Sequence, residues 1–246
     1  MLKLTSFAGV LCLILLTPGI PAAADTLPET ETLQQRLVRL DSLRSGVSTQ
    51  FDVVEQQGEE LLARYRSRQD RAKIYYQLAE IYAQSGINRT YLKVGQYGRL
   101  ALASLSDPVR KATLSIYLGD AAQMDDRTTG LEARRTRATM VYLTGYRELL
   151  RYNLPDVAPE LPMVGMYDVD GPPAEMERVR KLHDRQMQAH EEAKFQRQMI
   201  ALRTILLRQI SNLYTKPPVN RAELAEIAHR ILKDRRAEIE FLARCN

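Results

Sequence analysis

Histidine and cysteine are scarce in this chain, which has three histidines, two cysteines and no tryptophan among its 246 residues. Nucleophilic catalysis requires a base within hydrogen-bonding reach of a serine or cysteine. No histidine lies in a Gly-x-Ser-x-Gly setting or beside a cysteine, and the chain lacks a glycine-rich phosphate loop, a Cys-x-x-Cys pair and a His-Glu-x-x-His motif. We therefore predict a non-catalytic protein with no catalytic residues.

The sequence also lacks a set of side chains with the spacing of a metal site. His183 and His190 are seven residues apart, so on a helix they share a face but lie about 10 Å from each other, too far to share a metal ion without an intervening ligand. Residues 168–171 (DVDG) are similar to part of a calcium loop, and Glu177 follows six residues later. A third carboxylate is missing and two prolines intervene. We expect neither a metal nor another cofactor.

Long apolar runs are absent beyond the N-terminus, and no later segment reaches the about 18 apolar residues of a membrane span. Residues 7–16 form a ten-residue apolar run that follows Lys3 and precedes Pro18 and the small residues 22–24. This layout is typical of a secretory signal peptide, and its apolar core is too short to cross a bilayer. We expect residues 1–24 to be cleaved after Ala24. The mature protein would then be exported, periplasmic or extracellular, and not an integral membrane protein.

The cysteines are Cys12 and Cys245, so cleavage of the leader leaves one thiol and no intrachain disulfide. Leu11 precedes Cys12 where lipid modification requires a small residue, which argues against a lipoprotein anchor. In an oxidising compartment the remaining Cys245 either pairs with another chain or is an exposed thiol without a role.

Charge is unevenly distributed along the chain. Residues 25–170 carry 19 Lys and Arg against 20 Asp and Glu, whereas residues 171–246 carry 15 against 10. Export argues against nucleic acid, so the basic C-terminal part favours another protein or an anionic envelope component as partner. Arg178, Lys181 and Arg185 recur at three- and four-residue spacing and share a helix face, which makes them the candidate partner-binding residues. A merely solvated helix face is the alternative.

Apolar residues recur at helical spacing from residue 33 to residue 150, and strict alternation over five or more residues does not occur. Asp107 and Pro108 have the residue types of an N-cap and a first helical position. The pattern predicts an all-α protein, with a helical repeat-like domain over residues 25–150.

Residues 151–173 interrupt this pattern with five prolines and two glycines, yet they retain several apolar side chains that a disordered linker would lack. We expect this connecting loop to lie in extended form against the helices and to bury some of those side chains. It is either a structural crossover or a loop that covers a ligand.

The last part of the chain, residues 174–246, predicts a long helix of some 40 residues that spans about 60 Å. Its first half has few apolar residues and is therefore expected to project beyond the core. Lys216-Pro217-Pro218 would turn the chain, and Asn220 with Glu223 is typical of a capping box at the start of a final helix. The two helices would form an antiparallel hairpin.

The chain contains an internal similarity at a spacing of 40 residues. Residues 74–83 aligned with residues 114–123 place Leu78 on Leu118, Ala79 on Gly119, and Glu80 on Asp120. A small residue after a leucine lets a partner helix approach closely. We therefore expect both leucines to be buried in helix–helix contacts.

Here the chain resembles tetratricopeptide-type repeats, with Tyr75, Leu78, Ala79 and Tyr82 in the places of the first helix's signature. The resemblance covers about residues 70–150. Its spacing of 40 residues differs from the about 34 of the family, and Ala122 stands where the second large aromatic belongs. The resemblance implies an array of helical hairpins that binds a peptide or protein in a concave groove.

The sequence as a whole predicts an exported, non-catalytic helical protein that acts as a protein–protein interaction or scaffold module. The alternative is an enzyme or small-ligand binder whose site is covered by the loop of residues 151–173. A closed pocket with converging titratable groups would favour the alternative, and an open groove would favour the interaction protein.

Overall fold

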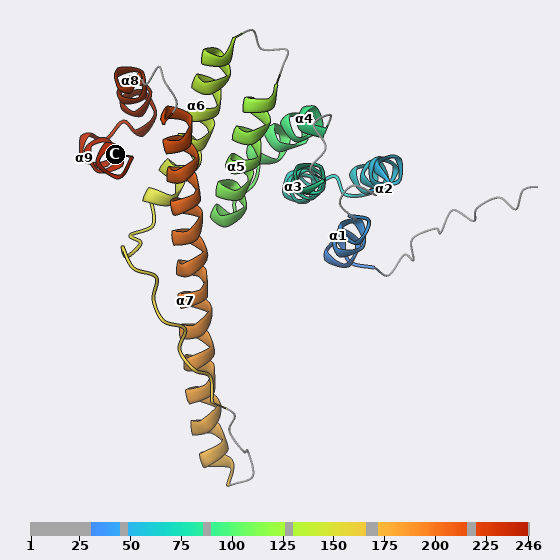
Figure 1. Ribbon diagram of the computed structural model, residues 1–246. Coiled ribbons are helices and arrows are strands. Elements are labelled where there is room, and N and C mark those ends of the chain that lie inside the picture. The colour runs from blue at the N-terminus through green and yellow to red at the C-terminus, as the bar shows by residue number, and fades with distance from the viewer. Residues whose placement is uncertain are drawn as a thin grey trace, which may run out of the picture. The chain divides into compact units, whose positions relative to one another are not determined.

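The computed structural model describes residues 31–44, 49–85, 90–125, 130–165, 172–215 and 220–245. The predicted signal peptide lies outside these residues. The chain divides into two units, Met1–Thr32 and Leu33–Asn246, and every described helix belongs to the second unit. Regular structure in the described residues is entirely helical, which confirms the predicted all-α class (Figure 1). The helices are α1 (Leu33–Ser42), α2 (Phe51–Arg64), α3 (Arg68–Gln84), α4 (Tyr91–Leu102), α5 (Pro108–Met124), α6 (Leu131–Leu150), α7 (Pro173–Tyr214), α8 (Arg221–Leu232) and α9 (Arg235–Arg244).

Side-chain caps explain where several helices begin. The Asp107 carboxylate accepts hydrogen bonds from the backbone N–H groups of Val109 and Arg110, with Pro108 at the first turn of α5, as the sequence predicted. Ser67 caps α3 by accepting from the Asp70 N–H, forty residues before Asp107. Equivalent caps therefore start α3 and α5 at equivalent positions of the sequence.

The helices of the second unit pack in a regular order. Each of α1 to α6 packs against the next helix, and the odd-numbered helices α1, α3, α5 and α7 also pack against one another in succession. The even-numbered helices α2, α4 and α6 pack mainly on the odd-numbered ones. Figure 1 shows the two resulting rows. The pattern places one face of each odd-numbered helix along a common surface.

The 40-residue similarity of the sequence has a counterpart in the packing of α2 on α3 and of α4 on α5. A Cβ atom added to Gly58 of α2 would lie 2.9 Å from Leu78 Cδ2, and one added to Gly98 of α4 would lie 2.7 Å from Leu118 Cδ2. The same leucine–glycine contact thus recurs forty residues apart. Leu78 and Leu118 are 1% and 7% exposed, which confirms that both are buried.

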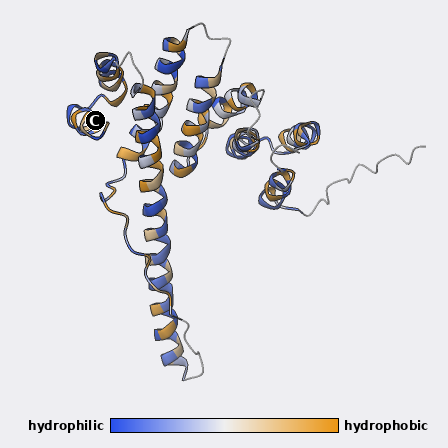
Figure 2. Ribbon diagram, in the orientation of Figure 1, coloured by the Kyte–Doolittle hydropathy of each residue, from blue (hydrophilic) through white to orange (hydrophobic). Residues whose placement is uncertain are grey.

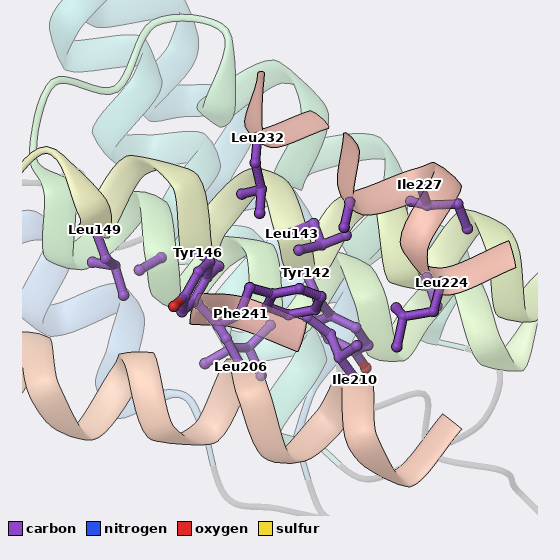
Figure 3. Close-up of a cluster of buried hydrophobic side chains, with 14 of the residues drawn as sticks. Tyr142, Leu143, Tyr146, Leu149, Leu206, Ile210, Leu224, Ile227, Leu232 and Phe241 are labelled. Carbon is purple, nitrogen blue, oxygen red and sulfur yellow. The ribbon is translucent and has the colours of Figure 1, made fainter. Parts of the chain in front are cut away.

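Gly119, the small residue after Leu118, lets an aromatic ring of α6 lie against the backbone of α5. Its position faces the ring of Tyr142 on α6, and an added Cβ would lie 2.1 Å from Tyr142 Cε1. Tyr142 is fully buried and belongs to the largest core cluster, which joins α5 and α6 to the C-terminal helices (Figure 3). In the same cluster the rings of Tyr146 and Phe241 lie 5.5 Å apart. This core fixes α6, α7 and α9 around one another.

The connecting segment of residues 151–165, which we call the strap, runs in the opposite direction to α7 and along it (Figure 1). Side chains of α7 bind its backbone at four points: Arg203 to the Pro155 carbonyl, Arg197 to the Pro159 carbonyl, His190 to the Pro162 carbonyl, and Gln186 to the Gly165 N–H. The expected extended form is therefore correct for the described part of the loop.

The expected burial of some of the strap's apolar side chains occurs near its start. Leu154 packs against the core, but Val157 and Met163 are 80% and 91% exposed. Met163 lies beside the polar half of α7, where residues 173–192 include no buried side chain (Figure 2). The strap is held there by hydrogen bonds to its backbone rather than by apolar contacts.

The expectation of a single final helix is wrong, because the helix is interrupted between α8 and α9. Lys233 adopts a left-handed conformation with φ 56°, and the Asp234 carboxylate then caps α9 by accepting from the N–H groups of Arg236 and Ala237. The main neighbours of α8 are α6 and α9. The expected pairing of α7 with one antiparallel helix is replaced by two short helices, the first of which packs on α6.

An ion pair with little exposure fixes α8 against α6. Arg135 donates to Glu223 at 2.7 Å, and Thr136 donates to the other oxygen of the same carboxylate. The Arg135 guanidinium also lies 5.1 Å from the centre of the Tyr214 ring. The residue that the sequence placed in a capping box therefore joins two helices far apart in the chain, while Asn220 caps α8 through the Glu223 N–H.

Candidate interaction surfaces

The three basic residues singled out in the sequence lie on the exposed half of α7. Arg178, Lys181 and Arg185 are all exposed, and Lys181 forms an ion pair of 3.3 Å with Glu177 one turn before it. Exposed pairs of this kind contribute little to folding. The three charges are therefore accessible to a partner.

A polar stripe runs along the outer face of α3 and continues on α5. The Glu80 carboxylate accepts hydrogen bonds from the hydroxyls of Tyr76 and Tyr117 and from the amides of Gln77 and Gln84. The sequence matched Glu80 to Asp120 but gave no signal for the tyrosine donors, because these come from other turns and helices.

Asp120, at the equivalent position of α5, is held by Tyr142. The Tyr142 hydroxyl donates to the Asp120 carboxylate at 2.5 Å and accepts from the Gln123 amide at 2.6 Å. Burial raises the pKa of Asp120 above its usual range, and the hydrogen bond from Tyr142 opposes this shift. Asp120 also lines a cavity of about 340 Å³ with Tyr117, Gln123 and Gln209. The stripe is therefore a polar surface with partly buried carboxylates.

A second cavity lies between α4 and α6, over α5, and we call it the α4–α6 groove. Its volume is about 300 Å³, and its apolar part includes Leu118, Ala121 and Val141. Arg99 and Arg137 also line it. The sequence alone does not predict this groove, although the absence of a large aromatic residue at Ala122 is a signal for its position.

The histidines do not converge on a common site. His190 contacts the Pro162 carbonyl at 2.9 Å, and His229 contacts the Glu238 carboxylate at 3.1 Å. Among the described residues, no group of three or more His, Cys, Asp or Glu side chains could hold a metal ion. The strap touches α7 through separate side chains along its length, and its Asp156 carboxylate forms ion pairs with Arg203 of α7 at 3.8 Å and with Arg244 of α9 at 2.7 Å.

Cys245 differs from the freely exposed thiol that the sequence allowed. It is partly buried and packs against the largest core cluster. Burial raises the pKa of the Cys245 thiol to about 11, so the reactive thiolate is a minor species at neutral pH.

Within the described ranges, the structure contains no helix that is both long enough and apolar enough to traverse a membrane. Comparison of the chain with protein-family models, with curated proteins and with solved structures finds no match.

Proposed function

We propose that this chain is an exported, non-catalytic protein with tetratricopeptide-like helical repeats. We propose further that it acts as a protein–protein interaction or scaffold module, either in the cell envelope or outside the cell. The observation that carries this proposal is the recurrence of one packing arrangement at forty residues. The contact of Gly58 with Leu78 in the helix pair α2–α3 is repeated by the contact of Gly98 with Leu118 in the helix pair α4–α5. Repeated stacking of this kind provides extended binding surfaces.

The order of helix contacts supports the same proposal. In arrays of helical hairpins, the first helices of successive hairpins line one face, which these proteins use for binding. Here the contacts of α1 with α3, of α3 with α5, and of α5 with α7 provide such a face. The polar stripe on α3 and α5 lies along it, and the α4–α6 groove lies in the other row.

We further propose that the basic face of α7 contacts an acidic protein or an anionic envelope component. Charges on an exposed helix accelerate encounter with a partner of opposite charge, and salt weakens the effect. Arg178, Lys181 and Arg185 meet this description because they are exposed and lie on the half of α7 that has no buried residue.

Reversing Arg178, Lys181 and Arg185 to Glu is expected to leave thermal stability nearly unchanged and to reduce recovery of an acidic partner at low salt. A matched control reverses Arg66, Arg235 and Arg236, which are also exposed and give the same change in net charge. The measurement is quantitative mass spectrometry of proteins recovered from an envelope extract at low and high salt. Equal recovery by the wild type and both variants at both salt concentrations would refute a role for this face.

The proposed export has a direct test on the natural host. The apolar run and the small residues at 22–24 predict a mature chain that begins at Asp25. Intact-mass measurement of the protein isolated from the envelope or the medium should give the mass of residues 25–246. A chain recovered from the cytoplasm with Met1 still attached would contradict both the cleavage and the compartment.

A further inference from the structure

The aromatic side chain of Tyr82 fills the space between α2 and α4, which we call the α2–α4 groove. Its ring stacks on Phe51 of α2 at 4.9 Å and on Tyr97 of α4 at 5.9 Å. Its hydroxyl donates to Glu55 at 2.8 Å, and the side chain is only 3% exposed. One side chain from α3 therefore closes this groove.

Forty residues later, the α4–α6 groove has the same construction without the filling side chain. The residues equivalent to Phe51, Glu55, Tyr82 and Tyr97 are Tyr91, Gly95, Ala122 and Arg137. All four of these equivalents line the cavity of about 300 Å³. The cavity therefore lies at the position where the α2–α4 groove holds the ring of Tyr82 and the Glu55 carboxylate that binds its hydroxyl.

A further small residue lines the same cavity. Ala121 of α5 occupies the position equivalent to Ile81 of α3, which is fully buried. Leu118 and Val141 complete an apolar lining beneath the opening. A dry apolar cavity of about 150 Å³ is sufficient for a benzene molecule, so the groove has room for the ring of a tyrosine or phenylalanine.

The charged residues at the opening of the α4–α6 groove have the opposite sign to those of the α2–α4 groove. Glu55 and Glu59 of α2 correspond to Gly95 and Arg99 of α4. Arg137 pairs with Asp125 at 3.7 Å, whereas Arg99 forms no ion pair or side-chain hydrogen bond within the part of the chain that the structure describes. The opening thus offers one guanidinium that is available to a carboxylate.

We propose that the α4–α6 groove binds an aromatic side chain of a partner polypeptide and that Arg99 binds a carboxylate next to that residue. The inference rests on the proposed protein-binding function and names the chemistry of the partner. The ring lies between Tyr91 and Arg137, as the ring of Tyr82 lies between Phe51 and Tyr97. Arginine and tyrosine side chains both favour stacking on an aromatic ring.

The test uses three short probe peptides and the full mature chain. The probes are acetyl-Asp-Tyr-Asp-amide, acetyl-Asp-Ala-Asp-amide and acetyl-Lys-Tyr-Lys-amide, and binding is measured by NMR titration. Burial of one aromatic side chain corresponds to about tenfold or more in affinity. We expect the acidic tyrosine peptide to bind at least about tenfold more tightly than the alanine peptide, and more tightly than the basic tyrosine peptide.

Two variants locate the site. Ala122→Tyr, alone or together with Gly95→Glu, gives the α4–α6 groove the filling residues of the α2–α4 groove. It should abolish peptide binding without lowering the melting temperature. Arg99→Gln should weaken binding of the acidic tyrosine peptide while leaving the melting temperature unchanged, because Arg99 is exposed and has no ion pair or side-chain hydrogen bond with the described residues. Ala189→Tyr, at an exposed position of α7, is the matched control and should bind like the wild type.

Three results would overturn the inference: equal binding of the tyrosine and alanine peptides, undiminished binding by folded Ala122→Tyr, or undiminished binding by Arg99→Gln. If Ala122→Tyr does not fold, Arg99→Gln and the peptide comparison still decide the question. Failure of the proposed function is distinguishable, because it requires that the wild type recover no partner from the envelope extract. Recovery of partners with no binding of the peptides overturns only the present inference.

Discussion

Replacing Gly119 by alanine is expected to lower the free energy of unfolding by about 3 kcal/mol, as overpacking of a close helix contact does. The added Cβ would lie 2.1 Å from a ring atom of Tyr142. The ring has little freedom to move, because it is fully buried and its hydroxyl is bound to both Asp120 and Gln123. The gain in helix propensity of about 1 kcal/mol for alanine over glycine offsets only part of this cost.

Gly95→Ala is the matched control for this prediction. Gly95 also lies inside a helix, but the nearest atoms to an added Cβ are the guanidinium nitrogens of Arg99, at 3.9 Å. The same substitution should therefore raise the free energy of unfolding, by up to about 1 kcal/mol. Urea denaturation of both variants measures the difference. A Gly119→Ala variant as stable as the wild type would show that the Tyr142 ring of α6 does not lie against Gly119 of α5.

Leu78→Ala is expected to lower the free energy of unfolding by about 2–5 kcal/mol, the usual range for truncation of a buried leucine. Leu78 is 1% exposed and packs against Gly58, which has no side chain that could move into the cavity. The loss should therefore lie in the upper part of that range.

Leu100→Ala is the control, since Leu100 is 46% exposed on α4. A surface substitution of this kind changes stability by about 0.5 kcal/mol or less. The two variants are compared by urea denaturation monitored by circular dichroism. A loss for Leu78→Ala as small as that for Leu100→Ala would mean that the face of α3 with the repeated leucine is not a core face.

The features predicted correctly from the sequence are those set by local periodicity. Helical spacing identified the all-α class, and Asp107 with Pro108 located the start of α5. The alignment at forty residues identified Leu78 and Leu118 as buried, because a leucine followed by a small residue suits a close helix contact. In each case the deciding residues lie within one or two turns of each other, and the alignment finds the same local pattern again forty residues later.

The features that were missed depend on residues distant in sequence or on a conformation without a usual marker. The break between α8 and α9 occurs at Lys233 rather than at a glycine, so only the capping residue Asp234 could have indicated it. The hydrogen bond of Tyr142 with Asp120 joins two helices, and periodicity says nothing about it.

The α4–α6 groove lies between these two cases. Ala122 departs from the repeat pattern of the sequence, but a missing aromatic residue alone does not distinguish a collapsed contact from an open one. Only the positions of Gly95 and Arg137 around it establish that the space stays open. The alignment at forty residues therefore identifies the replacement of tyrosine by Ala122, and the packing of α4 and α6 determines that the space stays open.

The hydrogen bonds between the strap and α7 also bear on the order in which the chain folds. The four pairs are nested, with sequence separations of 21, 28, 38 and 48 residues from Gly165–Gln186 outward to Pro155–Arg203. Once the innermost pair forms, each further pair closes only a short additional loop, so its entropic cost is small. The strap can therefore assemble on α7 as a zipper that starts from the contact of lowest separation, without a search over the whole chain.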